Sequence, residues 1–193
     1  CRRGASSGNA AMTIALYCPM KPPDHPVASG DREFARLIAR IIEGLGETPL
    51  LASRLRTWRA EPDAATFAAL EAASASEAER IVADWRDDGA RPAAWITYHL
   101  YHKAPDWIGP AVTRALGIPY VVVEASRAPK RASGLWAPGF AAADQALAAA
   151  DAVVAMHAED REGLAPVVAA DRLFDLAPFI DTAPFAAAAP RPR

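Results

Sequence analysis

The sequence predicts an α/β fold in which a mostly parallel, Rossmann-like sheet carries helices on both faces. Three observations predict it: short apolar runs recur along the chain, each is followed by a segment with helical periodicity, and the connections between them are short. Strands that alternate with helices pair in parallel and are covered on both faces. At 193 residues, the chain is long enough for one well-buried domain and short for two.

Each expected strand is a compact apolar run that ends in proline, glycine or polar residues. The runs are Thr13–Cys18, Pro49–Ala52, the run that begins at Trp95, Tyr120–Val123, Ala152–Met156 and Arg172–Leu176.

The first expected helix is the clearest in the sequence. Its apolar residues follow one helical face, and Gly46 stands where a left-handed C-terminal cap is needed. These apolar residues are Phe34, Leu37, Ile38, Ile41, Ile42 and Leu45.

Further helices are expected between the later strands. Ser76 and Glu79 form a capping-box pattern inside the Ala- and Glu-rich segment 62–88, which predicts two helices there rather than one. Asp106 is expected to cap a helix that Gly117 ends, with Pro119 beyond it. The last two expected helices are Phe140–Ala150 and Glu159–Ala170.

Composition excludes some classes of function and partner. The net charge of -2 and the pI near 6.1 give no global attraction to nucleic acid or to an anionic bilayer, so nucleic acid is not an expected partner and membrane-surface association has no support. Cys1 and Cys18 fit no metal spacing and no disulfide framework, which favours a reducing cytoplasm. No apolar run approaches the roughly 20 residues of a membrane span.

The ends of the chain differ in composition from the rest. Residues 1–11 have no hydrophobic centre of a signal peptide and are expected to be a disordered leader. Residues 12–178 form the expected Rossmann-like domain, and the Ala-, Pro- and Arg-rich stretch 179–193 is expected to be a truncated interdomain linker.

Three loops that carry polar residues should emerge at one edge of the sheet, because the carboxyl ends of parallel strands meet there. The first contains Ser29, Gly30, Asp31 and Arg32 at the start of a helix. A glycine lets a ligand approach the backbone, and the free N–H groups of a first turn favour an anion. In the alternative interpretation, Ser29 or Asp31 merely caps the helix and Gly30 relieves a tight turn.

The second loop contains His99, Tyr101, His102 and Lys103. Imidazoles at a strand end can bind a sugar hydroxyl or a phosphate oxygen, or exchange protons near neutral pH. Strand alternation predicts that His99 and Tyr101 point to one face and that Tyr98 and Leu100 point to the other. The alternatives are a histidine bonded only to backbone and tyrosines packed in the core. No further ligand lies at metal spacing, so no metal site is expected.

The third loop contains Glu124, Ser126, Arg127, Lys130 and Arg131. Cations beside a strand-end carboxylate form a local anion site on a slightly acidic protein. The alternative is a solvated basic loop in which Glu124 neutralises Arg127 or Lys130.

The order of these elements resembles a known family. The Ser29-Gly30 loop, the segment Trp95–Pro105, the run Asp151–Ala155 and the segment Leu176–Phe185 look like the amino-terminal half of a family 4 glycosyltransferase of the GT-B type. In the last segment, Asp181 and Phe185 match the pattern at the junction between the two domains of the family. The resemblance covers about residues 13–185.

The resemblance implies an acceptor-binding domain that moves a sugar from a nucleotide-sugar, with retention, only together with a carboxyl-terminal domain. The nucleotide-sugar is then a co-substrate, and no metal or cofactor is expected. The expected catalytic residues are His99, His102 and Glu124. The expected residues for donor phosphate or acceptor are Ser29, Gly30, Arg32, Lys103, Ser126, Arg127 and Lys130.

One departure from the family pattern concerns chemistry. Many members place a histidine at the end of the strand that matches Tyr120–Val123, where this chain has Glu124. Either the acceptor chemistry differs, or His99 or His102 takes over that role. Two alternatives stay open: a stand-alone Rossmann-like or flavodoxin-like binding module, and half of a sugar-nucleotide epimerase.

Overall fold

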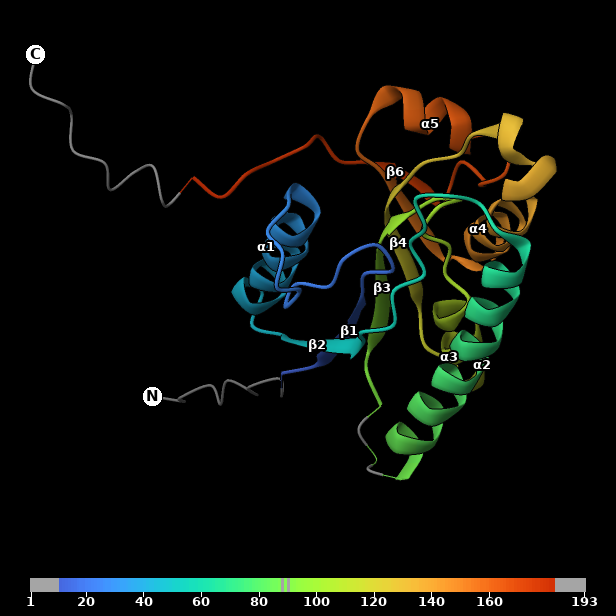
Figure 1. The fold of residues 1–193 in the computed structure, drawn as a ribbon. Helices are drawn as coiled ribbons and strands as arrows, with labels where there is room; N and C mark the ends of the chain where they lie inside the picture. Colours follow the sequence, from blue (N-terminus) through green and yellow to red (C-terminus); the bar gives the residue numbers. More distant parts are fainter. Residues whose placement is uncertain (1–10, 88, 90, 183–193) are drawn as a thin grey trace, which may run out of the picture.

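One parallel sheet of six strands forms the centre of the protein in a computed structural model that describes residues 11–87, 89 and 91–182. The strand order is β2-β1-β3-β4-β5-β6 (Figure 1). The strands are β1 (Thr13–Tyr17), β2 (Thr48–Ser53), β3 (Ala94–Leu100), β4 (Tyr120–Ala125), β5 (Ala152–Ala155) and β6 (Leu173–Asp175). The α/β, Rossmann-like class expected from the sequence is confirmed.

Helices cover both faces of the sheet, with α1 on one face and α2, α3 and α4 on the other (Figure 1). The α-helices are α1 (Gly30–Gly44), α2 (Ala64–Asp87), α3 (Ile108–Leu116), α4 (Ala137–Ala149) and α5 (Ala158–Leu164). Two short 3-10 turns, η1 (Pro129–Arg131) and η2 (Gly134–Trp136), precede α4.

Each face of the sheet has its own apolar core. Leu16 and Tyr98 pack against Ile38 and Ile42 on the α1 side. On the other side a larger core surrounds the fully buried Trp95. Alternate residues of a strand point to opposite faces, so adjacent strand residues contribute to the two cores in turn.

The sheet has a switch point between β1 and β3. From β1 the chain passes through α1 to β2 on one side, and β3 lies on the other side of β1. In open α/β sheets, ligands bind beyond the carboxyl ends of the strands at such a point. The loops that follow β1 and β3 are therefore the expected ligand-binding loops.

The helix ends expected from the sequence are confirmed at three places. Gly46 and Gly117 have φ of 84° and 60°, the left-handed conformation that glycine adopts without a steric penalty. Asp106 accepts hydrogen bonds from the backbone N–H groups of Ile108 and Gly109, both at 2.8 Å, at the start of α3.

The expectation of two helices in the segment 62–88 is wrong, because α2 runs without a break from Ala64 to Asp87. Its sequence contains neither glycine nor proline and is rich in alanine, the residue with the highest helix propensity. Its buried residues keep one helical face throughout, so the local pattern at Ser76 and Glu79 starts no new helix. These buried residues are Phe67, Leu70, Ser74, Ala78 and Ile81.

The helix expected at Glu159–Ala170 is shorter, since α5 ends at Leu164. Pro166 lacks the backbone N–H that would continue the helical hydrogen bonds, which explains the early end. The last strand is likewise shorter than the expected Arg172–Leu176.

The ends of the chain are described only in part. Residues 1–10 of the expected leader and 183–193 of the expected linker lie outside the described residues. The described part of the linker packs on α1: the rings of Phe179 and Phe34 are 5.2 Å apart, and Arg40 Nη2 lies 3.5 Å from Asp181 Oδ2. Among the described residues, no helix has both the length and the apolar character needed to cross a membrane.

Candidate functional site at the strand ends

The start of α1 forms the first part of the strand-end edge. Ser29 Oγ accepts a hydrogen bond from the Arg32 backbone N–H at 3.2 Å, so Ser29 caps the helix. Gly30 is the first residue of α1, and a Cβ added there would meet nothing within 4 Å. The backbone at Gly30 thus faces open space, where a ligand can come close.

Arg32 is engaged within its own loop. Its guanidinium donates to the carbonyl of His25 at 3.0 Å and to Glu33 Oε1 at 2.7 Å. This side chain fixes the loop between β1 and α1 to the helix, which leaves the neighbouring backbone as the ligand-facing part.

The ends of β3 and β4 share an unusual backbone conformation. The strand register pairs Tyr98 with Val123 and Leu100 with Ala125, which places His99 opposite Glu124. His99 has φ of 65° and Glu124 has φ of 59°. Non-glycine residues rarely adopt positive φ, and such residues cluster at functional sites. Two of the three expected catalytic residues, His99 and Glu124, are therefore neighbours that both have positive φ.

The expected alternation along β3 is wrong beyond Tyr98. Tyr98 packs on the α1 side of the sheet, but Leu100 belongs to the core on the opposite side. The positive φ of His99 interrupts the regular strand geometry, so the residues after it point to the opposite face of the sheet from the one that alternation predicts.

Asp31 is the residue of this site whose role the sequence did not reveal. Its Oδ1 lies 3.0 Å from His99 Nδ1, although the two atoms are not aligned for a hydrogen bond. The negative charge of Asp31 also contributes to the raised pKa of Tyr101, after burial. Its place one residue after Gly30, on the helix that follows β1, is the signal that could have identified it.

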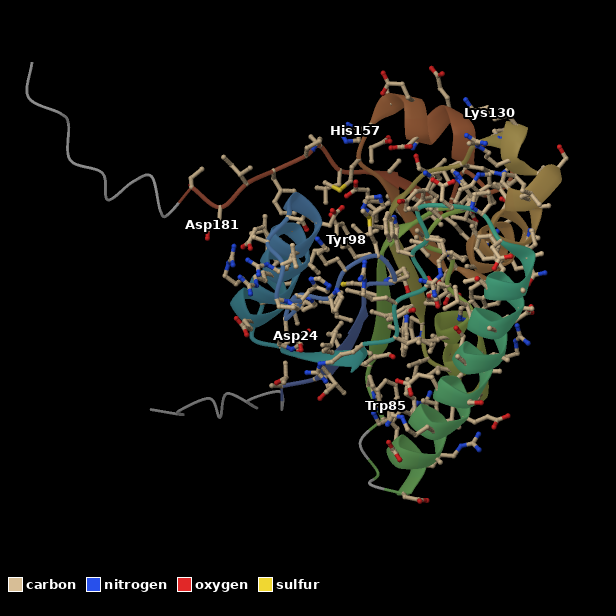
Figure 2. The ribbon with its side chains drawn as sticks, in the orientation of Figure 1. Asp24, Trp85, Tyr98, Lys130, His157 and Asp181 are labelled. Atoms are coloured by element: carbon tan, nitrogen blue, oxygen red, sulfur yellow. The ribbon has the colours of Figure 1, made fainter. Side chains whose placement is uncertain are left out.

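Tyr98 lies on the α1 side of the sheet (Figure 2), and the charge of Glu124 acts on its phenol. Burial raises the pKa of the Tyr98 phenol, and the charge of Glu124 and a hydrogen bond to its carboxylate raise it further. Tyr98 therefore stays protonated, with its phenol close to the Glu124 carboxylate.

His102 lies in a positive and partly buried environment. Its ring is perpendicular to that of Trp136, with 5.1 Å between ring centroids, and its Nε2 is buried without a hydrogen-bond partner among the described residues. Burial lowers the pKa of His102, and the charges of Arg131 and Lys103 lower it further. The imidazole is therefore neutral at pH 7.

The third expected loop is only partly available to a ligand. Arg127 binds Asp144 through two hydrogen bonds of 2.9 Å and covers the ring of Phe140, with 5.0 Å to its centroid. Ser126 Oγ donates to Asp160 of α5. The alternative in which Glu124 neutralises Arg127 is therefore wrong, because α4 supplies the counter-ion. A contact with a residue on a distant helix cannot be predicted from the sequence around Arg127.

Lys130 lies on the exposed surface of η1, and no ion pair ties it to the described part of the chain (Figure 2). No group of three or more His, Cys, Asp and Glu side chains in the described ranges could hold a metal ion. Cys18, at the end of β1, is a buried free thiol whose pKa is raised by burial.

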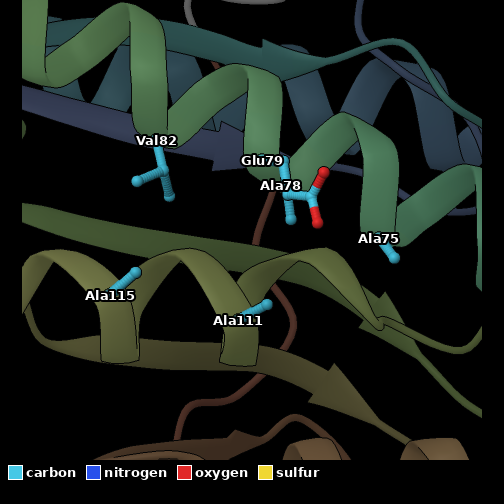
Figure 3. A pocket seen from close by; sticks show the side chains of 6 residues that line it. All are labelled: Ala75, Ala78, Glu79, Val82, Ala111 and Ala115. Atoms are coloured by element: carbon cyan, nitrogen blue, oxygen red, sulfur yellow. The ribbon is translucent and has the colours of Figure 1, made fainter.

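An apolar hollow between α2 and α3 lies away from the strand ends (Figure 3). Methyl groups and one carboxylate line it, so it presents little that could carry chemistry. The lining residues are Ala75, Ala78, Glu79, Val82, Ala111 and Ala115. The chemically equipped surface is the strand-end edge, where Gly30, Asp31, His99, Glu124 and the His102 turn come together.

Comparison with known proteins gives the fold. No protein-family model and no curated protein matches the sequence. A solved UDP-glucosyltransferase from Polygonum tinctorium is similar in structure with a TM-score of 0.52 and 11% identity, over 95% of this chain and 56% of that one. The chain has the fold of part of a GT-B enzyme.

A solved UDP-N-acetylglucosamine 2-epimerase from Rickettsia bellii is also similar, with a TM-score of 0.49 and 14% identity, over 86% of this chain and 44% of that one. The chain thus spans about half the length of each of these two structures.

Proposed function

We propose that this chain is the acceptor-side domain of a sugar-transferring enzyme of the GT-B type, similar to family 4 glycosyltransferases. In this proposal a nucleotide-sugar is the donor, and a second Rossmann-like domain outside these 193 residues holds most of it. The two domains close around both substrates, exclude water and align the acceptor oxygen with the anomeric carbon. The sugar is transferred with retention, and no metal ion takes part.

The observation that carries the proposal is the position of His99, which lies opposite Glu124 at the strand ends and 3.0 Å from Asp31, the residue after Gly30. The open backbone at Gly30 supports a site for donor phosphates at the start of α1. Two paired strand-end residues in the left-handed conformation support a site held in a defined geometry.

The side chains of this site are proposed to act on the acceptor. Glu124, close to Tyr98, accepts a hydrogen bond from an acceptor hydroxyl, and His99 contacts the sugar next to Asp31. His102 and Lys103 bind further out on the acceptor. Arg32 and Arg127 act as positioning residues, because their guanidinium groups are held by protein partners.

Gly30 allows a test with a matched control. Neither Gly30 nor Gly44, at the two ends of α1, has an atom within 4 Å of an added Cβ, and neither has positive φ. Both alanine variants should fold. In the natural gene product, Gly30→Ala should lower kcat/KM for a nucleotide-sugar at least tenfold by excluding its phosphates, whereas Gly44→Ala should not. Equal activities of the two variants would remove the phosphate site from the proposal.

A second test concerns the need for another domain. The 193-residue chain should transfer no sugar by itself, and the natural gene product should do so when given a nucleotide-sugar and an acceptor. Release of the nucleotide can be followed by chromatography. Rapid turnover of the nucleotide-sugar by the 193-residue chain alone would refute the two-domain proposal. An epimerised nucleotide-sugar as the product would identify an isomerase instead of a transferase.

A further inference from the structure

The turn after β3 is fixed between two other loops at the strand-end edge. The backbone N–H of Arg59, in the β2–α2 connection, donates to the Lys103 carbonyl at 2.8 Å, and Trp58 Nε1 donates to the Tyr101 hydroxyl at 3.0 Å. On the other side the His102 ring contacts Trp136 of η2. Two segments far apart in the sequence therefore flank this turn.

This arrangement gathers cations that have no counter-ion among the described residues. Arg59, Lys103 and Arg131 form no salt bridge with any described residue. The positive charges of Lys103 and Arg131 both act on the His102 ring between them.

Two nitrogen atoms, one in this turn and one in the residue whose backbone bonds to it, are buried and lack a hydrogen-bond partner in the described chain. They are Arg59 Nε and His102 Nε2. Buried polar atoms are nearly always hydrogen-bonded in folded proteins, so an unused donor inside a positive cluster indicates a ligand. The Arg59 guanidinium can only donate, and His102 Nε2 donates when it carries the imidazole proton. Both properties suit an acceptor of hydrogen bonds with negative charge.

We propose that Arg59, His102, Lys103 and Arg131 bind a phosphate monoester carried by the sugar acceptor. A phosphate group presents several charged oxygens and can accept from donors that come from three loops. This inference rests on the proposed function, in which the start of α1 takes the donor phosphates. The cluster lies with α4 and Phe67 on the opposite side of the sheet from α1, so its anion belongs to the other substrate.

The walls of the site add a preference for a ring next to the phosphate. Arg56 lies over the half-buried Trp58, with 5.8 Å to the ring centroid, and Lys103 Nζ lies 5.2 Å from that of Trp136. Trp136 is buried beneath Lys103, whereas Trp58 is only half-buried and can contact a ring next to the phosphate. We therefore expect phenyl phosphate to bind more tightly than inorganic phosphate.

The test is a titration of the 193-residue chain with phenyl phosphate, inorganic phosphate and benzoate, followed by NMR signals of the tryptophan indole N–H groups. Phenyl phosphate should bind saturably, shift the Trp58 and Trp136 signals, and bind at least tenfold more weakly to Lys103→Ala/Arg131→Ala. The matched control is Arg86→Ala/Arg114→Ala, which removes the same charge from exposed positions on α2 and α3. Circular dichroism verifies that both double variants fold, and Lys103→Gln provides a milder change at the site.

Two results would overturn the inference: absence of saturable phenyl phosphate binding, or equal weakening by the two double variants. Benzoate binding as tightly as phenyl phosphate would overturn the assignment to phosphate. These outcomes do not depend on sugar transfer. A chain that binds phenyl phosphate at this cluster while the natural gene product transfers no sugar would refute the proposed function and leave the phosphate site in place.

Discussion

Strands β3 and β4 carry two polar clusters that differ in how fully their side chains are hydrogen-bonded. Beneath α3, every oxygen of the buried Asp106 carboxyl group is used. Oδ2 accepts from Thr97 at 2.6 Å and from Tyr120 at 2.8 Å, and Oδ1 accepts from the N–H groups of Ile108 and Gly109. Trp95 Nε1 donates to Thr97 and extends this network.

The second cluster lies a few residues further along the same strands. His99 and Glu124 have positive φ, and His102 Nε2 has no hydrogen-bond partner in the described chain. Along these strands, the polar groups that stabilise the fold are therefore separate from the groups that are available for chemistry. Saturated polar groups lie under the helix, and unsaturated or conformationally strained groups lie at the open end, where a ligand can complete them.

The largest expected effect is at the saturated cluster. Asp106→Ala should lower the free energy of unfolding by about 3 kcal/mol or more, because it removes the cap of α3 and leaves buried hydroxyl groups without an acceptor. Urea unfolding measures this, and Asp106→Asn should lose less because an amide oxygen remains. A loss below about 1 kcal/mol would show that the network adds little.

The next effect concerns how the strand-end cluster is anchored. A Cβ at Gly139 of α4 would overlap the His102 carbonyl and come within 3.0 Å of the Phe67 ring. Gly139→Ala should therefore cost about 2 kcal/mol of stability, as overpacking does in a well-packed interior. Gly44→Ala is the control, since open space surrounds it. Equal urea midpoints for the two variants would contradict a rigid contact between α4 and the His102 turn.

A smaller effect of opposite sign is expected at the strained position. Glu124→Gly should leave stability unchanged or raise it by up to about 1 kcal/mol, because glycine adopts positive φ without strain. Under the proposed function, the same change should abolish sugar transfer by the natural gene product. Val123→Gly, one residue earlier in β4, should be destabilising. If both variants lose the same free energy of unfolding, Glu124 belongs to the structural cluster.

Much of the fold could be predicted because its signals are local. Apolar runs gave the six strands in order, and Gly46 and Gly117 marked helix ends by the conformation that they adopt. The prediction failed at Ser76, where a local capping pattern competes with continuous packing of one face of α2 against the core. Packing over the whole helix decides such cases, and a short window does not contain it.

The sequence was enough to place the site at an edge of the sheet, but not to predict the contacts that its side chains make. Position after a strand was enough to select His99, His102 and Glu124, since parallel strands bring their carboxyl ends together. The partner of Arg127 is Asp144, 17 residues away on α4. A positive φ at His99 has no local signature either, because the surrounding structure imposes it.

The smallest expected effect tests the positive field around His102. Its pKa is lowered by burial and by the charges of Arg131 and Lys103, so the folded protein binds this proton less readily than the unfolded chain. The contribution of His102 to the free energy of unfolding should therefore fall as pH drops below about 6.5, and the loss should continue down to the pKa of the folded state.

Lys103→Ala should raise the pKa of His102 toward its ordinary value, because one nearby cation is removed while burial remains. NMR titration of the imidazole C–H signals measures this, with the exposed His157 as a reference in the same spectrum. Lys21→Ala removes the same charge from the β1–α1 loop and should leave the pKa of His102 where it is. If Lys103→Ala and Lys21→Ala give the same pKa for His102, burial alone lowers that pKa. The strand-end cluster would then differ from the Asp106 cluster in hydrogen bonding and backbone conformation but not in the effect of nearby charges.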